Sequence, residues 1–302
     1  MNKYYKNNVF IIGFGERVRS DIYPILREIV EDSKITIFSK SPRKENIEGT
    51  IINSFDIDEL REKFNIHKPH ILIVSIPPKS LMELFNSTLG GLNFENTKLF
   101  IDTPIMKKNI LESNNFKSVQ ILEDFPPSPI GSLLLNFVNL NSKIIIFYKS
   151  FFAYHGYSLL RFLANELGGK RIRRIFKTKI LTLFSIDDKY IFIYGKRDYN
   201  QGRLLALSKK RIIQDSDVNI RKIGTNILFD INENVIYKTT YTKEKLERNK
   251  SIFQQIDSFK RIGLYDLFYK SIVEDEVNLN RNKITKLEEA YNDYSQSKDL
   301  YN

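Results

Sequence analysis

One short stretch near the amino terminus constrains the fold more than any other. An apolar run over residues 9–12 leads directly into Gly13-Phe14-Gly15, and a helical pattern follows from Glu16. A strand, a glycine turn and a helix in this order are typical of the start of a dinucleotide-binding unit. Gly13 permits the tight turn, and Gly15 leaves room for a pyrophosphate beside the backbone N–H groups of the helix start. The alternative is a glycine turn in another kind of α/β protein.

The third glycine of the usual fingerprint is absent, because Val18 occupies its position. A larger side chain there is expected to hold the first helix further from the strand. Arg17 beside it could reach a phosphate. We therefore expect a pyrophosphate-binding turn formed by Gly13, Phe14, Gly15, Arg17 and Val18.

The alternation of apolar strands and helices continues over about 125 residues. Helices are predicted at 16–31, 56–64 and 79–89, and further strands at 34–38, 50–52, 70–78 and 98–104. This alternation predicts a doubly wound parallel sheet, in which ligands bind at the carboxyl ends of the strands. Those ends are expected at residues 13–17, 39–43, 75–78 and 102–104.

The end of the second predicted strand bears on the choice of cofactor. In dinucleotide-binding domains an acidic residue near this point binds the ribose 2′-hydroxyl of NAD. Here the segment has no acidic residue and instead offers hydroxyls and positive charge, at Ser39, Lys40, Ser41 and Arg43. Such groups suit a 2′-phosphate, so the sequence favours NADP(H) over NAD(H). The alternative is an ordinary basic surface loop.

The pattern changes from about residue 126. Helices are predicted at 130–140 and 155–167, strands at 172–184, 190–194, 203–207, 227–231 and 235–240, and closing helices at 251–272 and 284–297. Successive strands separated by turns indicate a mainly antiparallel sheet with one solvated face. We thus expect an N-terminal Rossmann domain over 1–125 and an α+β domain over 126–302 for substrate and oligomerisation, whose last helix could pack back on the first domain.

Composition excludes several classes of site and partner. The chain has no cysteine and only three histidines, so disulfides, thiolate nucleophiles and a typical metal site are not expected. No apolar run is long enough to span a membrane, which predicts a cytoplasmic protein with no membrane partner. The net charge is +11, yet only residues 170–174 form a dense basic cluster. A phosphorylated, nucleotide-linked or otherwise anionic small-molecule substrate is therefore favoured over nucleic acid.

In the order and spacing of its motifs the chain resembles the glucose–fructose oxidoreductase/inositol dehydrogenase family (Gfo/Idh/MocA). The resemblance is carried by Gly13-Phe14-Gly15, residues 73–78, Asp102-Thr103-Pro104, a histidine-bearing helix start over 154–160 and a closing helix around 289–295. It implies an NAD(P)-dependent oxidoreductase, and a homodimer contact through the C-terminal sheet is one expectation. It also adds cofactor contacts at Ser75, Ile76, Pro77, Asp102 and Pro104.

Three departures from the family pattern bear on the chemistry. Thr103 stands where the family usually carries a lysine beside the reacting carbon, and Phe151 and Ser158 stand where it often carries aspartates. Thr103 can form a hydrogen bond there but supplies no charge. His155 remains as the first candidate for the general acid, with Tyr154 second and Tyr157 close in sequence. The alternative for His155 is a histidine satisfied by backbone groups at a helix start.

Some family members that lack the lysine reduce C=N or conjugated substrates. Delivery of hydride to an activated carbon needs positioning and one acid. We therefore expect an NADP-dependent reductase of a small molecule through a C=N, C=O or conjugated bond. The alternative is a catalytically silent nucleotide-binding scaffold or sensor, which the loss of the lysine and aspartates favours.

Overall fold

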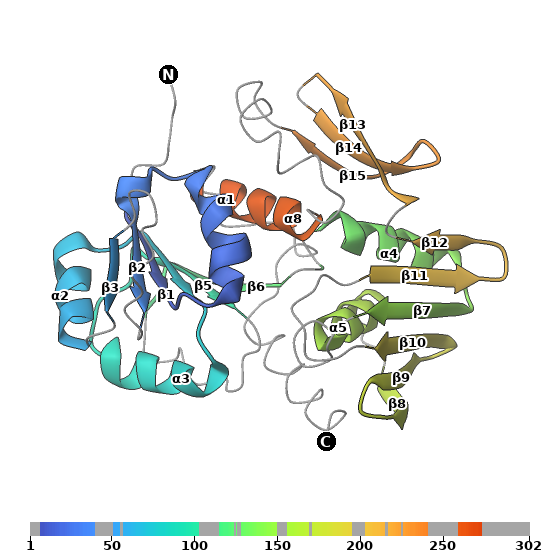
Figure 1. The fold of residues 1–302 in the computed structure, drawn as a ribbon, viewed down its shortest axis with the longest axis horizontal. Coiled ribbons are helices and arrows are strands. Elements are labelled where there is room, and N and C mark those ends of the chain that lie inside the picture. The colour runs from blue at the N-terminus through green and yellow to red at the C-terminus, as the bar shows by residue number, and fades with distance from the viewer. Residues whose placement is uncertain are drawn as a thin grey trace. The chain divides into compact units, whose positions relative to one another are not determined.

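The computed structural model describes twelve segments of the chain: residues 7–39, 51–54, 57–102, 115–123, 125, 128–149, 156–168, 171–194, 203–214, 217–224, 226–240 and 259–273. The chain divides into two compact units (Figure 1). The first comprises Met1–Glu123 and Leu267–Ser295, and the second comprises Asp124–Asp266 and Gln296–Asn302.

The first unit is built on a six-stranded sheet in which every pair of neighbouring strands is parallel. Its strands are β1 (Val9–Ile12), β2 (Ile35–Ser39), β3 (Ile51–Ser54), β4 (Ile71–Val74), β5 (Lys98–Asp102) and β6 (Ser118–Leu122). Their order is β3-β2-β1-β4-β5-β6, that of a doubly wound dinucleotide-binding sheet. The predicted α/β parallel sheet is confirmed. Strand β6 was not predicted, because Ser118 and Gln120 interrupt its apolar pattern.

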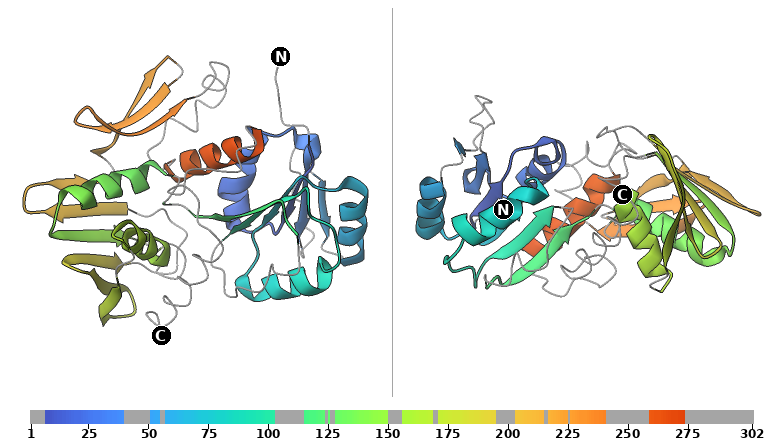
Figure 2. Two further views of the ribbon diagram at one scale, coloured as in Figure 1. Left: turned by 180° about the vertical axis from the view of Figure 1, so that it is seen from behind. Right: turned by 90° about the horizontal axis from the view of Figure 1, so that it is seen from below.

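Both faces of this sheet are covered by helices. The even-numbered side chains of β1, including Phe10, form a core cluster with α2 (Ile57–His67) and α3 (Pro78–Glu83). Phe10 meets Phe64 of α2 edge to face, with ring centroids 5.0 Å apart. The odd-numbered residues of β1 are fully buried too, and α1 (Tyr23–Arg27) lies on that other side of the sheet (Figure 2). Burial on both faces explains why β1 and β4 are apolar throughout.

The helix after β1 is shorter and less regular than predicted. It begins at Glu16, contains a π-helical turn over Val18–Ile22, and continues as α1 to Arg27. A short 3₁₀ turn over Asp32–Lys34 then leads into β2. The apolar spacing correctly indicated the buried face, since Val18 and Ile22 are fully buried, but spacing alone does not reveal where a helix ends.

The second unit contains α4 (Pro129–Leu140), α5 (Tyr157–Glu166) and two sheets. The larger sheet has the order β12-β11-β7-β10-β9-β8, and β7 and β10 are its one described parallel pair. Its strands are β7 (Ile144–Lys149), β8 (Ile172–Lys177), β9 (Leu181–Ile186), β10 (Lys189–Tyr194), β11 (Arg203–Ser208) and β12 (Ile212–Gln214). The smaller sheet is an antiparallel meander of β13 (Asn219–Ile223), β14 (Asn226–Ile231) and β15 (Asn234–Thr240).

The sequence-based strand at 172–184 is wrong in one respect, because it is a hairpin of two strands. A turn at Thr178 separates β8 from β9: its backbone N–H donates to the carbonyl of Leu181 at 2.7 Å, and its hydroxyl accepts from the N–H of Leu181 at 3.0 Å. Thr178, between Lys177 and Lys179, carries little turn signal, so the break was missed. Strands β7, β12 and β13 were also not predicted.

The larger sheet buries one face and leaves the other partly exposed. On the exposed face, five apolar side chains from neighbouring strands are aligned in register, and we call them the apolar row: Phe176, Leu183, Phe192, Phe147 and Leu205. The rings of Phe147 and Phe192 stack with centroids 4.9 Å apart. Phe176 is 51% exposed, and the other four are partly exposed.

A buried polar cluster joins β15 to α8 (Phe259–Phe268) within the second unit. The Asp266 carboxylate accepts hydrogen bonds from the Tyr237 hydroxyl and, at 2.7 Å, from the Thr239 hydroxyl. Burial, the charge of Asp266 and the hydrogen bond to it raise the pKa of Tyr237 well above its ordinary value. Tyr237 therefore remains protonated, and the cluster stays intact, through neutral and mildly alkaline pH.

The segment after Asp266 belongs to the first unit. Phe268 packs against Phe100 of β5, and the following π-helical turn (Tyr269–Val273) places Ser271 beside the start of β5 and the middle of β6. The ammonium of Lys98 donates to the Ser271 carbonyl, and the Ser271 hydroxyl donates to Gln120 at 3.1 Å. The last predicted helix, 284–297, lies outside the described residues. Among the described helices, none is long and apolar enough to cross a membrane.

Candidate functional site

The predicted binding residues that the structure describes lie along one edge of the parallel sheet. Gly13 follows β1, Ser75 follows β4, Asp102 ends β5 and Ser39 ends β2. Strand order reverses between β1 and β4, so these two adjacent strands are followed by chain segments that leave in opposite directions. Open α/β sheets bind their ligands at this switch point.

Gly13 is required by the sheet itself. Its φ is +102°, and a Cβ atom on it would lie 2.1 Å from the carbonyl oxygen of Ser75. Its own N–H donates to the carbonyl of Phe38 at 2.8 Å, and the N–H of Ser75 donates to Ile12 at 2.9 Å. Gly13 therefore lets the ends of β1, β2 and β4 approach one another closely.

Gly15 has a different environment. It is exposed, and a Cβ atom built on it would have no described atom within 4 Å. Its carbonyl accepts the first hydrogen bond of the helix, from Arg19, at 3.1 Å. Packing among the described residues thus gives no reason for glycine at this position. The space beside a helix start suits the approach of a phosphate group to the backbone.

Phe14 and Val18 anchor this turn to the core. Phe14 is 5% exposed and Val18 is fully buried, so Val18 fills the space that a third glycine would leave between helix and sheet. Both side chains point into the protein, and only the backbone of these two residues remains for a ligand.

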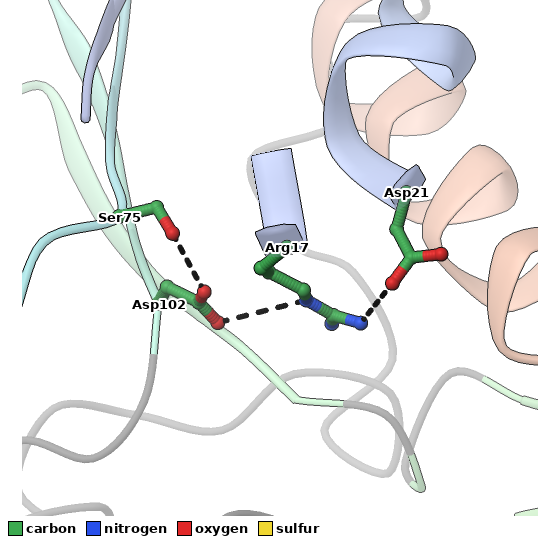
Figure 3. A network of polar contacts seen from close by, with 4 residues as sticks. All are labelled: Arg17, Asp21, Ser75 and Asp102. Atoms are coloured by element: carbon green, nitrogen blue, oxygen red, sulfur yellow. Dashed lines mark hydrogen bonds and ion pairs between the residues drawn. The ribbon is translucent and has the colours of Figure 1, made fainter. Parts of the chain in front are cut away.

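Arg17 takes part in a network of ionic contacts that sequence reasoning did not foresee (Figure 3). Its Nη1 lies 3.0 Å from Oδ2 of Asp21, and its Nε lies 3.9 Å from Oδ1 of Asp102. The hydroxyl of Ser75 donates to the other oxygen of Asp102 at 2.8 Å. The network therefore connects the first helix to the ends of β4 and β5.

This network is largely shielded from water, which strengthens its electrostatic interactions. The side chains of Arg17, Asp21 and Asp102 are 14%, 20% and 16% exposed, so salt screens their charges less than it screens charges on the open surface. The ion pair of Arg17 with Asp21 could have been predicted from the sequence, because oppositely charged residues four positions apart on a helix lie side by side. The contact of Asp102 with Ser75 follows only from the strand order.

For the other predicted site residues the structure gives only the exposure of the side chain, or no description. Ser39 is 8% exposed, Ile76 is partly exposed and Pro77 is exposed at the start of α3. Seven predicted residues lie outside the described part of the chain: Lys40, Ser41, Arg43, Thr103, Pro104, Tyr154 and His155. Among the described residues there is no cluster of histidine and carboxylate side chains that could hold a metal ion.

The chain is similar to known proteins in its structure. No protein-family model matches the chain, and no curated protein matches it in sequence. A dehydrogenase (MviM) from Clostridium difficile superposes with a TM-score of 0.58 at 12% identity, covering 99% of each chain. GenD2 from gentamicin A biosynthesis, solved in complex with NAD, superposes with a TM-score of 0.59 at 7% identity, covering 100% of this chain and 95% of GenD2.

A Gfo/Idh/MocA family oxidoreductase from Vibrio cholerae superposes with a TM-score of 0.53 at 8% identity, covering 99% of this chain and all of the other. At such low identities the likeness concerns the fold. It extends over nearly the whole length in each case. The chain therefore has the fold of the Gfo/Idh/MocA oxidoreductases.

Proposed function

We propose that the protein is an NADP-dependent oxidoreductase that reduces a small molecule by hydride transfer. The observation that carries the proposal is the turn at Gly15, which is open to a ligand at the switch point of a parallel sheet with the dinucleotide-binding strand order. The fold shared with oxidoreductases, one of them solved in complex with NAD, supports the same class of function.

Each group of residues has a distinct role in this proposal. The backbone of 13–18 and the guanidinium of Arg17 bind the pyrophosphate, and Ser75, Ile76, Pro77, Asp102 and Pro104 border the nicotinamide end. When bound, the nicotinamide cofactor supplies the hydride. The buried side chains of Phe14 and Val18 hold the turn in place.

The preference for NADP(H) rests on the end of β2. The described strand ends in Ser39, and no carboxylate follows it before Glu45. Lys40, Ser41 and Arg43 supply two positive charges and a hydroxyl for a 2′-phosphate.

The chemical step requires one proton donor. The loss of the family lysine at Thr103 favours a substrate whose carbon is already activated, with a C=N, C=O or conjugated bond, and the positive net charge suits an anionic or carrier-linked one. His155 donates the proton, Tyr154 is the second candidate, and Thr103 hydrogen-bonds nearby. The same loss is the observation that favours a silent nucleotide-binding scaffold or sensor as the second candidate function.

The two glycines provide a matched test of the pyrophosphate turn. Gly15→Val should abolish NADPH binding and leave the melting temperature unchanged, because its Cβ meets open space where the phosphates approach. Gly13→Ala should destabilise the fold by about 1–3 kcal/mol or more, because alanine is strained at this φ and would contact Ser75. Nicotinamide fluorescence and thermal unfolding are the measurements. A Gly15→Val protein that binds NADPH normally contradicts the site.

Cofactor choice is tested by removing the positive charges after β2. Wild type should bind NADPH more tightly than NADH. The double variant Lys40→Ala, Arg43→Ala should bind NADPH more weakly, by about 1.5–3 kcal/mol of binding free energy for each charged hydrogen bond lost. NADH affinity should stay the same. Lys209→Ala with Lys210→Ala, which removes the same charge from the exposed β11–β12 turn, is the control. Equal affinity of wild type for NADPH and NADH contradicts the preference.

The acid is tested on the full-length protein with a panel of imines, keto sugars and conjugated acceptors. His155→Asn should slow single-turnover NADPH oxidation by about 10²–10⁴-fold, since it removes the donor but keeps a hydrogen bond. The dissociation constant of NADPH should stay within about threefold because the donor acts on the substrate. His67→Asn, at an exposed histidine of α2, is the control. An unchanged rate would assign proton donation to a group other than His155. If wild type binds NADPH but turns over no compound of the panel, the silent scaffold is favoured.

We also propose that the apolar row pairs with the same row of a second copy. Homodimer interfaces are two-fold and more apolar than ordinary surface, and the five side chains of the row are all uncharged. Light scattering should give the molecular mass of a dimer for wild type and of a folded monomer for Phe192→Asp. Ile66→Asp, at a 64% exposed apolar side chain of α2, should remain dimeric. A monomeric wild type, or a dimeric Phe192→Asp protein, contradicts this pairing.

A further inference from the structure

We propose that Asp102 competes with the phosphate groups of the cofactor for Arg17, and so limits the affinity of the site for dinucleotide. The inference rests on the dinucleotide site proposed above and adds an opposing charge within it. It is carried by the geometry of the network around Arg17 (Figure 3).

The two carboxylates beside Arg17 are bound differently. Asp21 lies one helical turn after Arg17 and accepts its Nη1 hydrogen bond at 3.0 Å, so the two move together as parts of one helix. Asp102 lies on another element, and its 3.9 Å separation from Nε is longer than a hydrogen bond. This contact is therefore the weaker of the two and the easier for an arriving anion to replace.

Asp102 does not depend on Arg17 for its position. Its other oxygen accepts the hydroxyl of Ser75 at 2.8 Å, and its backbone lies in register with Leu122 of β6. The carboxylate is thus fixed at the edge of the sheet whether or not Arg17 contacts it. A fixed charge of this kind acts on every ligand that enters the turn.

The balance of charge gives the direction of the effect. Arg17 carries one positive charge, and Asp21 and Asp102 together carry two negative charges, so these three side chains sum to −1. Two unit charges 4 Å apart interact by about 1 kcal/mol in water and more where water is excluded. A pyrophosphate at the turn is attracted by Arg17 and repelled by Asp102. Removing the carboxylate of Asp102 should therefore strengthen binding, which loss of a merely structural residue would not do.

The test measures NADPH dissociation constants of the full-length protein by nicotinamide fluorescence. Asp102→Asn keeps an acceptor for Ser75 and should bind NADPH about three- to tenfold more tightly than wild type, the size expected from about 1 kcal/mol of repulsion. Asp102→Ala, which removes the carboxylate without adding a polar group, should tighten binding as well. Arg17→Gln should weaken binding. In the Arg17→Gln background Asp102→Asn should tighten binding less than it does in wild type, because the competition for Arg17 is lost and only the direct repulsion by the carboxylate is removed.

Asp32→Asn is the matched control for net charge. Asp32 also pairs with an arginine, Arg27, through hydrogen bonds of 3.0 and 3.1 Å, but it precedes β2 at the opposite edge of the sheet. The Asp32→Asn protein should bind NADPH with the same affinity as wild type. Unchanged or weaker binding by both folded Asp102 variants, or tightening by Asp32→Asn to the same degree, overturns the inference and leaves the proposed function intact. A folded wild type that binds neither NADPH nor NADH overturns both.

Discussion

The first unit depends on the close approach of two backbones at the centre of its sheet. At Gly13 the chain passes so near the carbonyl of Ser75 that a single added carbon would lie 2.1 Å from that oxygen. This approach keeps β1 and β4 side by side up to their carboxyl ends, where the chain leaves the sheet in two directions. The turn at Gly15 and the helix start at Glu16 follow directly from it. The same close approach therefore also positions the carboxyl ends of β1 and β4, where doubly wound sheets bind their ligands.

Electrostatics at this edge oppose as well as favour an anionic ligand. The helix start and Arg17 favour a phosphate, whereas Asp21 and Asp102 partly neutralise the arginine and hold it in place. Preorganised groups lose little entropy on binding, but their fixed partners compete with the ligand. An arginine paired in this way avoids the desolvation cost of an isolated buried cation. The same pairing allows Arg17 to remain largely shielded in the dinucleotide site that we propose.

The sequence allowed the class of fold to be predicted because that class depends on local patterns. Fully buried parallel strands such as β4 are apolar at every position, and the glycine turn after β1 follows from the backbone conformation that Gly13 needs. What it did not reveal depends on contacts between distant residues. The pairing of Ser75 with Asp102 needs the strand order, and so does the parallel pairing of β7 with β10. The break between β8 and β9 was missed because Thr178, an ordinary β-forming residue, makes the turn.

The central claim is that a dinucleotide binds at the turn after β1. Amide hydrogen exchange of the full-length protein, with and without saturating NADPH, tests this claim directly because it reports which backbone groups the ligand protects. The account predicts slower exchange in peptides that cover residues 13–19 and 75–77, with no change at the exposed β11–β12 turn. Unchanged exchange at 13–19 in the presence of bound NADPH would contradict it.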